Sequence, residues 1–98
     1  MTYKIKYLPL AVQDLNDVAW YLSGFYPKTA SRALKEMRER ITKLGDNPRM
    51  CEIYPLDPAY RKMVVDQYLV FYQVNENTRT VEIHRVLRGS WNLPQYLE

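Results

Sequence analysis

Three runs in the second half of the chain, residues 60–65, 68–74 and 80–89, are rich in β-branched and aromatic residues. Short polar segments of the kind that form turns separate them, so the runs are predicted to form an antiparallel meander. The middle run is apolar at both alternating sets of positions, with Tyr68, Val70, Tyr72 and Val74 on one face and Leu69 and Phe71 on the other. A strand of this kind is covered on both sides, which places the middle run at the centre of the sheet.

The chain begins with a shorter alternating pattern and then changes to a helical one. Apolar and basic side chains alternate over residues 3–7, which predicts a first strand with one buried face. Pro9 suits the first turn of a helix, where its missing N–H has no intrahelical use. Apolar residues then recur at the spacings of an amphipathic helix, at Ala11, Leu15, Val18 and Leu22. Gly24 and Pro27 are predicted to end this helix.

A second amphipathic helix is predicted from about Thr29 to Leu44, with Gly45 as its C-cap. Residues 50–59, which include two prolines, show no period and are expected to be irregular. The two helices form a hairpin whose apolar stripes must cover the sheet. The expected fold is therefore α+β: an N-terminal strand, an antiparallel two-helix hairpin and an antiparallel three-stranded meander, in a single domain over residues 1–98.

Composition narrows the classes of protein to consider. A chain of 98 residues is large enough to fold without a disulfide or a metal. Cys51 is the only cysteine and His84 the only histidine, so we expect neither an internal disulfide nor a zinc site, and no cofactor. Residues 1–7 lack the apolar run of a secretory signal, and no window approaches the roughly 20 apolar residues of a membrane span. These features predict a cytoplasmic protein.

The net charge of +3 permits a polyanionic partner without demanding one. The distribution of charge is more informative, because Arg61 and Lys62 precede the middle strand and His84, Arg85 and Arg88 follow it. Functional residues are therefore sought on the two flanking strands.

The order of strand, helix hairpin and three-stranded meander within 98 residues resembles the RelE/ParE family of bacterial type II toxins. Segments in the helices and the sheet match in detail: residues 11–15, 41–48, 60–63, 68–74, 81–89 and 92–94. The last two segments, Val81 to Gly89 followed by Asn92-Leu93-Pro94, are most similar to the ParE branch. The resemblance covers essentially the whole chain.

The resemblance implies a stable toxin that is neutralised by a small antitoxin encoded beside it, whose C-terminal segment wraps the toxin. Operator DNA would be contacted only through the antitoxin, and no membrane is involved. RelE-like members cut messenger RNA in the ribosomal A site, whereas ParE-like members poison DNA gyrase. This chain departs from the RelE-like pattern at Leu69, where those members carry an arginine. Its final segment, Arg88-Gly89-Ser90-Trp91-Asn92, keeps only part of their final polar set.

Cleavage of RNA without a metal requires activation of the 2′-hydroxyl, stabilisation of the phosphorane charge and protonation of the 5′-oxygen. If the chain is an endoribonuclease, the candidate catalytic residues are Arg61, His84 and Arg88, and His84 has the ordinary pKa suited to proton transfer near neutrality. The candidates for binding a target are Lys62, Arg85, Arg88 and Trp91.

Several of these residues also have a purely structural interpretation. His84 pairs with Glu82 or with a cross-strand tyrosine, Arg85 is either hydrogen-bonded structurally or at a sheet edge, and Trp91 seals an edge of the core. Arg61 and Lys62 are expected on opposite faces. In a regular strand, two sets of side chains share a face: Glu82, His84 and Arg88, and on the other side Val81, Ile83, Arg85 and Leu87.

Three functions therefore remain open. The first is a gyrase-directed toxin, which the ParE-like ending and the missing arginine favour. The second is a ribosome-dependent endoribonuclease, which rests on Arg61, Lys62, His84 and Arg88. The third is a non-toxic relative that binds only its antitoxin. Strand edges and the groove beside the helix hairpin are the expected antitoxin sites.

Overall fold

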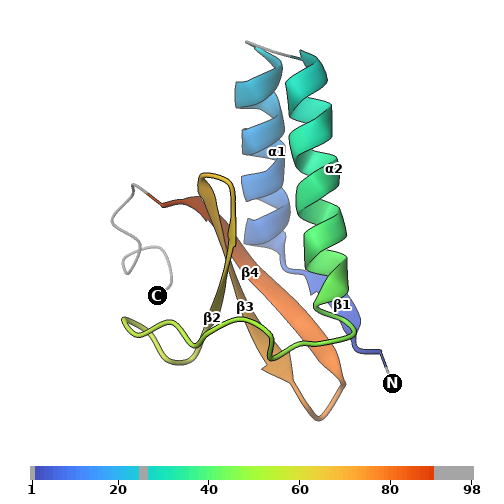
Figure 1. The fold of residues 1–98 in the computed structure, drawn as a ribbon, viewed down its shortest axis with the longest axis vertical. Helices are drawn as coiled ribbons and strands as arrows, with labels where there is room; N and C mark the ends of the chain where they lie inside the picture. Colours follow the sequence, from blue (N-terminus) through green and yellow to red (C-terminus); the bar gives the residue numbers. More distant parts are fainter. Residues whose placement is uncertain (1, 25–26, 90–98) are drawn as a thin grey trace.

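The computed structural model describes residues 2–24 and 27–89. It contains six elements: β1 (Lys4–Tyr7), α1 (Pro9–Ser23), α2 (Pro27–Lys43), β2 (Arg61–Val65), β3 (Tyr68–Asn75) and β4 (Thr80–Arg88). Their types and order confirm the α+β plan, with the helix hairpin standing against one face of the sheet (Figure 1). No helix in this part of the chain is both long and apolar enough to cross a membrane.

The sheet has the strand order β1-β4-β3-β2. Strands β2, β3 and β4 form the expected antiparallel meander. The first strand, β1, lies parallel to β4, with Lys4 opposite Thr80 and Tyr7 opposite Ile83. The prediction of an interior β3 is confirmed, but β4 is interior too over the length that β1 covers.

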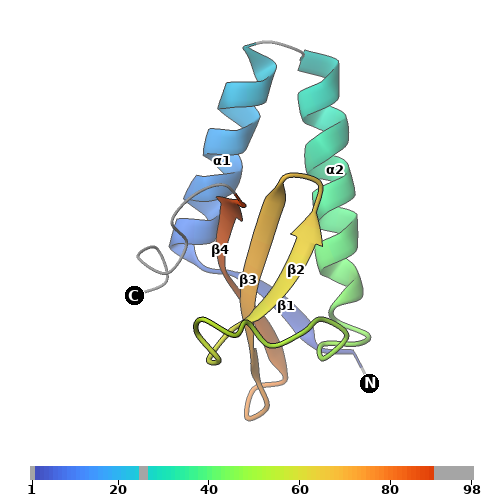
Figure 2. The same cartoon turned by 60° about the vertical axis from the view of Figure 1, so that its left-hand side comes forward.

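The core lies mainly between the helices and the sheet. Buried residues of α1, α2 and all three meander strands form this cluster, among them Ala11, Leu15, Met37, Ile41, Met63, Val70, Tyr72, Val81, Ile83 and Val86. A smaller cluster on the opposite face joins Tyr54, Phe71 and Leu87. Tyr54 comes from the irregular segment before β2, which runs across the sheet (Figure 2). Both faces of β3 are therefore covered, as its apolar pattern predicts.

The glycine after α2 has a different role from the one expected. A C-cap glycine usually takes a left-handed conformation, but no described glycine has a positive φ. Gly45 is instead a point of close approach, since an added Cβ would lie 2.8 Å from the backbone oxygen of Tyr3. The N–H of Tyr3 donates to the carbonyl oxygen of Gly45 at 2.7 Å. Small size at Gly45 thus lets β1 pack against the end of α2.

A β-bulge divides β4 into two halves. Tyr72 pairs with Ile83 and Phe71 with Arg85, so β4 carries one extra residue, His84. An extra residue reverses which face the following side chains occupy. Val81 and Ile83 face the helices before the bulge, but after it Leu87 belongs to the cluster on the opposite face.

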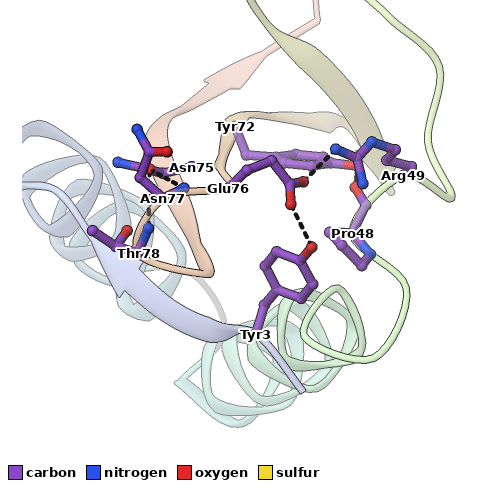
Figure 3. Close-up of polar contacts among 8 residues, drawn as sticks. All are labelled: Tyr3, Pro48, Arg49, Tyr72, Asn75, Glu76, Asn77 and Thr78. Carbon is purple, nitrogen blue, oxygen red and sulfur yellow. Dashed lines mark hydrogen bonds and ion pairs between the residues drawn. The ribbon is translucent and has the colours of Figure 1, made fainter. Parts of the chain in front are cut away.

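Polar contacts close the end of the sheet near the N-terminus (Figure 3). Glu76, in the turn between β3 and β4, accepts a hydrogen bond from the Tyr3 hydroxyl at 2.7 Å and forms an ion pair with Arg49. The Tyr72 hydroxyl donates to the carbonyl oxygen of Pro48 at 2.9 Å. The Tyr3 and Arg49 contacts lower the pKa of the Glu76 carboxyl. These contacts join the start of the chain, the segment after α2 and the β3–β4 turn.

Candidate functional site

Arg61 and Lys62, the first residues of β2, point to opposite faces of the sheet, as expected. Arg61 Nη1 donates to the carbonyl oxygen of Cys51 at 2.7 Å. Lys62 Nζ lies 3.4 Å from Glu52 Oε1 and 5.8 Å from the centre of the Tyr54 ring, on the face of the smaller cluster. Each cation already has a partner in the segment before β2.

His84 lies on the same face as Lys62 and is largely enclosed. Its ring packs edge-on against Tyr60, with ring centres 5.1 Å apart, and Nε2 is 4.0 Å from Glu82 Oε1. Burial lowers the pKa of His84, and the nearby Glu82 carboxylate opposes that shift. Nε2 has no hydrogen-bond partner among the residues described. Because burial favours the neutral form, we infer an uncharged imidazole at neutral pH.

Arg85 is held by Asp14 of α1. Arg85 Nε and Nη2 donate to the two carboxylate oxygens at 2.8 and 3.0 Å, and the N–H of Val86 donates to Asp14 Oδ2 at 2.9 Å. β1 pairs with β4 only as far as Ile83, so Asp14 covers the edge of β4 just beyond. Both alternatives considered for Arg85, a structural hydrogen bond and a sheet edge, apply together.

Arg88 reaches the side of the sheet that faces α1. Its Nη2 donates to Gln67 Oε1 at 3.1 Å, and its guanidinium lies 5.8 Å from the centre of the Tyr21 ring. A cavity of about 410 Å³ opens here, lined by Asp14, Asp17, Val18, Trp20, Tyr21, Tyr68, Val86 and Arg88. Trp20, on its rim, is 80% exposed. Exposed tryptophan, tyrosine and arginine are the residues that dominate protein–protein binding energies.

The structure separates the residues that the sequence grouped together. Glu82 and His84 do share a face, but Arg88 lies on the other one, so the expected grouping of His84 with Arg88 is wrong. The expected grouping of Arg85 and Leu87 with Val81 and Ile83 is also wrong, because after the bulge Arg85 lies opposite Phe71, and both Phe71 and Leu87 belong to the smaller cluster. The reason in both cases is the bulge at His84.

Arg61, His84 and Arg88 thus occupy three different places: beside Cys51, beside Tyr60 and beside Tyr21. Trp91 lies outside the described residues. Within residues 2–24 and 27–89, no group of three or more His, Cys, Asp or Glu side chains is arranged to hold a metal ion.

Sequence reasoning missed the contribution of α1 to this region. Asp14 carried a weak signal, because it falls three residues after Ala11 and four before Val18, at the border of the apolar stripe. An acid that is buried at such a border needs a partner. Trp20 and Tyr21 carried no comparable signal, since isolated exposed aromatic residues are common.

Comparisons with known proteins agree with this fold. The family model described as the ParE toxin of the type II toxin-antitoxin system parDE matches residues 5–93. Among solved structures, the chain is similar to the chromosomal ParDE system of P. aeruginosa, with a TM-score of 0.77 and 17% identity over 89% of this chain and 96% of that one.

Two further structures are toxin-antitoxin complexes. The RelBE2 complex of Mycobacterium tuberculosis is similar with a TM-score of 0.69 and 19% identity, over 93% of this chain and 95% of that one. The intact E. coli RelBE complex has a TM-score of 0.69 and 14% identity, over 91% and 99% of the two chains. No curated protein sequence matches this chain. Because the family model spans nearly the whole domain, the chain belongs to the ParE toxin family of type II toxin-antitoxin systems.

Proposed function

We propose that this toxin inhibits growth by poisoning DNA gyrase. The observation that carries the proposal is the separation of Arg61, His84 and Arg88 over both faces of the sheet. An endoribonuclease needs its base, its acid and its charge-stabilising cation around one phosphate. A toxin that acts by binding a protein has no such requirement.

The surface beside α1 has the properties of a protein-binding site. Trp20 of α1 and Arg88 of β4 border an open cavity, and the Tyr21 ring next to Trp20 lies 5.8 Å from the Arg88 guanidinium. The Asp14–Arg85 pair holds this part of α1 against β4. We therefore assign Arg88 to target binding together with Trp20. Lys62 remains a candidate contact on the opposite face, whereas Arg85 supports the site by holding α1 in place.

We also propose that a cognate antitoxin binds and neutralises the chain, and that the chain reaches operator DNA only through it. Two of the similar structures are toxin-antitoxin complexes, which supports this partner. The antitoxin is expected to be the product of the reading frame beside the toxin's own.

A gyrase assay tests the proposal directly. Purified toxin is added to DNA gyrase and relaxed plasmid, and supercoiling and double-strand breaks are followed on gels. We expect supercoiling to stop and gyrase-linked breaks to accumulate as toxin is added. Normal supercoiling at a large excess of toxin would refute the proposal.

A translation assay identifies the function that would replace it. Toxin is added to a purified translation system, and the message is mapped for cuts. Codon-phased cuts would establish the endoribonuclease, and an intact message with normal gyrase and unchecked growth would establish the non-toxic relative. Gyrase poisoning predicts an intact message and an early fall in thymidine incorporation.

A further inference from the structure

Positive charge is concentrated on α2. This helix carries six of the chain's fourteen lysines and arginines but only two of its eleven aspartates and glutamates. Its net charge is therefore +4, and the net charge of the rest of the chain is −1. Within residues 2–24 and 27–89, the helix has one ion pair, between Lys35 and Glu39, so the exposed side chains of Arg40 and Lys43 have no carboxylate partner there.

Arg40 and Lys43 border a groove between α2 and β2, which stand beside each other in Figure 2. This α2–β2 groove has a volume of about 450 Å³ and is lined by Arg40, Lys43, Met50, Cys51, Lys62, Met63 and Val64. Three of these residues are cationic and none is acidic. Because Lys62 Nζ lies 3.4 Å from Glu52 Oε1, Arg40 and Lys43 are the cations most available to a ligand. The groove therefore suits an anion.

The groove fits the phosphates of a double helix better than other polyanions. Proteins that bind single-stranded nucleic acid stack its bases on aromatic rings, and neither α2 nor the groove lining contains an aromatic residue. An extended acidic peptide carries at most one charge per about 3.3 Å. Duplex DNA carries one per about 1.7 Å of its axis, and cations that contact it gain further from the release of condensed counterions.

We propose that the α2–β2 groove binds the phosphate backbone of duplex DNA, so that the toxin holds the DNA on which gyrase acts. This inference rests on the proposed gyrase function and adds the DNA as a second partner. The cavity beside Trp20 and Arg88 shares no residue with the groove, and β3 separates β4 from β2 in the sheet. One toxin molecule can thus contact gyrase through the cavity and DNA through the groove, which would hold the two together during cleavage.

The first experiment measures binding of the toxin alone to a short labelled duplex of mixed sequence by fluorescence anisotropy. The logarithm of the binding constant should fall linearly with the logarithm of the salt concentration. We expect a slope of about −2 to −3, because each neutralised phosphate contributes about −0.9. Duplexes of different sequence should bind alike, since phosphate contacts carry no sequence information. A toxin that does not bind duplex DNA at low salt would overturn the proposal.

Two double variants separate the groove from the overall charge of the protein. Arg40→Gln with Lys43→Gln removes two cations of the groove, and Lys4→Gln with Lys6→Gln removes two exposed cations of β1, at the other edge of the sheet. The groove variant should bind DNA at least about tenfold more weakly, with a salt slope reduced by about 2. The β1 variant should keep the original slope. Equal losses in the two variants would overturn the assignment to the groove.

Competition identifies the class of polyanion. Unlabelled duplex DNA, single-stranded RNA and polyglutamate are added at equal concentrations of charge, and we expect duplex DNA to displace the label best. Stronger displacement by polyglutamate would overturn the proposal in favour of an acidic protein segment, and stronger displacement by RNA in favour of a single strand.

Lysine acetylation, followed by mass spectrometry, locates the contact in the unaltered chain. DNA should protect Lys43 and Lys62 but leave Lys4 and Lys6 as reactive as before. This measurement decides the matter if the groove variant fails to fold, and equal protection of all four lysines would contradict a site in the groove.

The gyrase assay distinguishes failure of this inference from failure of the proposed function. If the toxin poisons gyrase but binds no DNA by itself, only the groove is overturned. If the toxin binds duplex DNA through the groove while gyrase supercoils normally, the DNA site is supported and the gyrase function fails. Where both hold, Arg40→Gln with Lys43→Gln should raise the toxin concentration for half inhibition of gyrase by about tenfold, and the β1 variant should not.

Discussion

One carboxylate, that of Asp14, binds both the Arg85 guanidinium and the Val86 N–H of β4. The side chains of Arg85 and Asp14 are 17% and 10% exposed, so the ion pair is mostly shielded from water. The contact falls where β1 no longer covers β4. A helix side chain thus completes the hydrogen bonding of a strand edge.

Replacing Asp14 by alanine should therefore destabilise the protein strongly. The change removes two charge-assisted hydrogen bonds and uncovers the Val86 N–H, so we expect a loss of about 2 to 4 kcal/mol in the free energy of unfolding. Urea denaturation measures it. The control is Asp17→Ala on the same helix, where the residue is exposed and the expected change is within about 0.5 kcal/mol. Equal losses in the two variants would contradict the structural role.

Two glycine-to-alanine changes should have opposite signs. At Gly45 the new Cβ would meet the Tyr3 oxygen at 2.8 Å, so we expect a loss of about 1 to 3 kcal/mol. Gly24 has helical φ and ψ of −68° and −21°, and the new Cβ would lie 3.6 Å from the backbone oxygen of Tyr21, an ordinary van der Waals contact. Gly24→Ala should stabilise the protein by about 0.4 to 1 kcal/mol. Thermal unfolding of both variants checks the signs.

His84 should titrate below its ordinary pKa of 6.5. Burial disfavours the imidazolium, so the folded state takes up this proton at lower pH than the unfolded chain does. Above pH 6.5 His84 is neutral in both states and does not change the free energy of unfolding. That free energy declines as the pH falls below 6.5 toward the pKa of His84 in the folded state. Since the chain has a single histidine, its NMR titration needs no assignment. A midpoint at or above 6.5 would contradict the enclosed geometry.

Glu82 provides a second test of the same environment. Its carboxylate, 4.0 Å from His84 Nε2, favours the imidazolium and raises the pKa of His84. Glu82→Gln removes the charge with little change of shape, so the midpoint should move further down. Glu36→Gln on α2 is the matched control and should leave the midpoint unchanged. An upward shift in Glu82→Gln would show that another group controls the imidazole.

Arg88→Ala should reduce the potency of the toxin more than it reduces stability. Arginine beside exposed aromatic residues is a frequent determinant of binding energy, so we expect the toxin concentration for half inhibition of gyrase to rise by about tenfold. Arg32→Ala, at an exposed position on α2, is the control. Equal potency of the two variants would remove Arg88 from the target-binding surface.

The periodic parts of the chain are the parts that could be predicted. Apolar residues at helical spacing predict α1 and α2. The run from Tyr68 to Val74, which is apolar on both faces, predicts an interior strand, because burial on one side or on both sides requires these patterns. The faces of Arg61 and Lys62 followed from the same alternation.

The rest depends on single residues whose roles come from distant contacts. The bulge at His84 lies within a continuous run of strand-forming residues, so nothing local marks the change of face at Arg88. Gly45 has the sequence signature of a cap, yet its small size serves the approach of Tyr3. Asp14 of α1 binds Arg85 of β4, and periodicity alone does not show that this strand lies beside this helix. Each relationship requires knowing which strand lies next to which helix.

The parallel pairing of β1 with β4 also has a consequence for the timing of folding. Lys4 of β1 pairs with Thr80 of β4. The first strand to be synthesised therefore cannot pair until the last one has been made. Contacts this distant in sequence form slowly, and a chain ending at Arg79 should leave Lys4 and Lys6 open to trypsin, whereas the full chain should protect them. Resistance of the truncated chain would refute this. Completion of β4 during synthesis thus sets the moment at which the four-stranded sheet can first close.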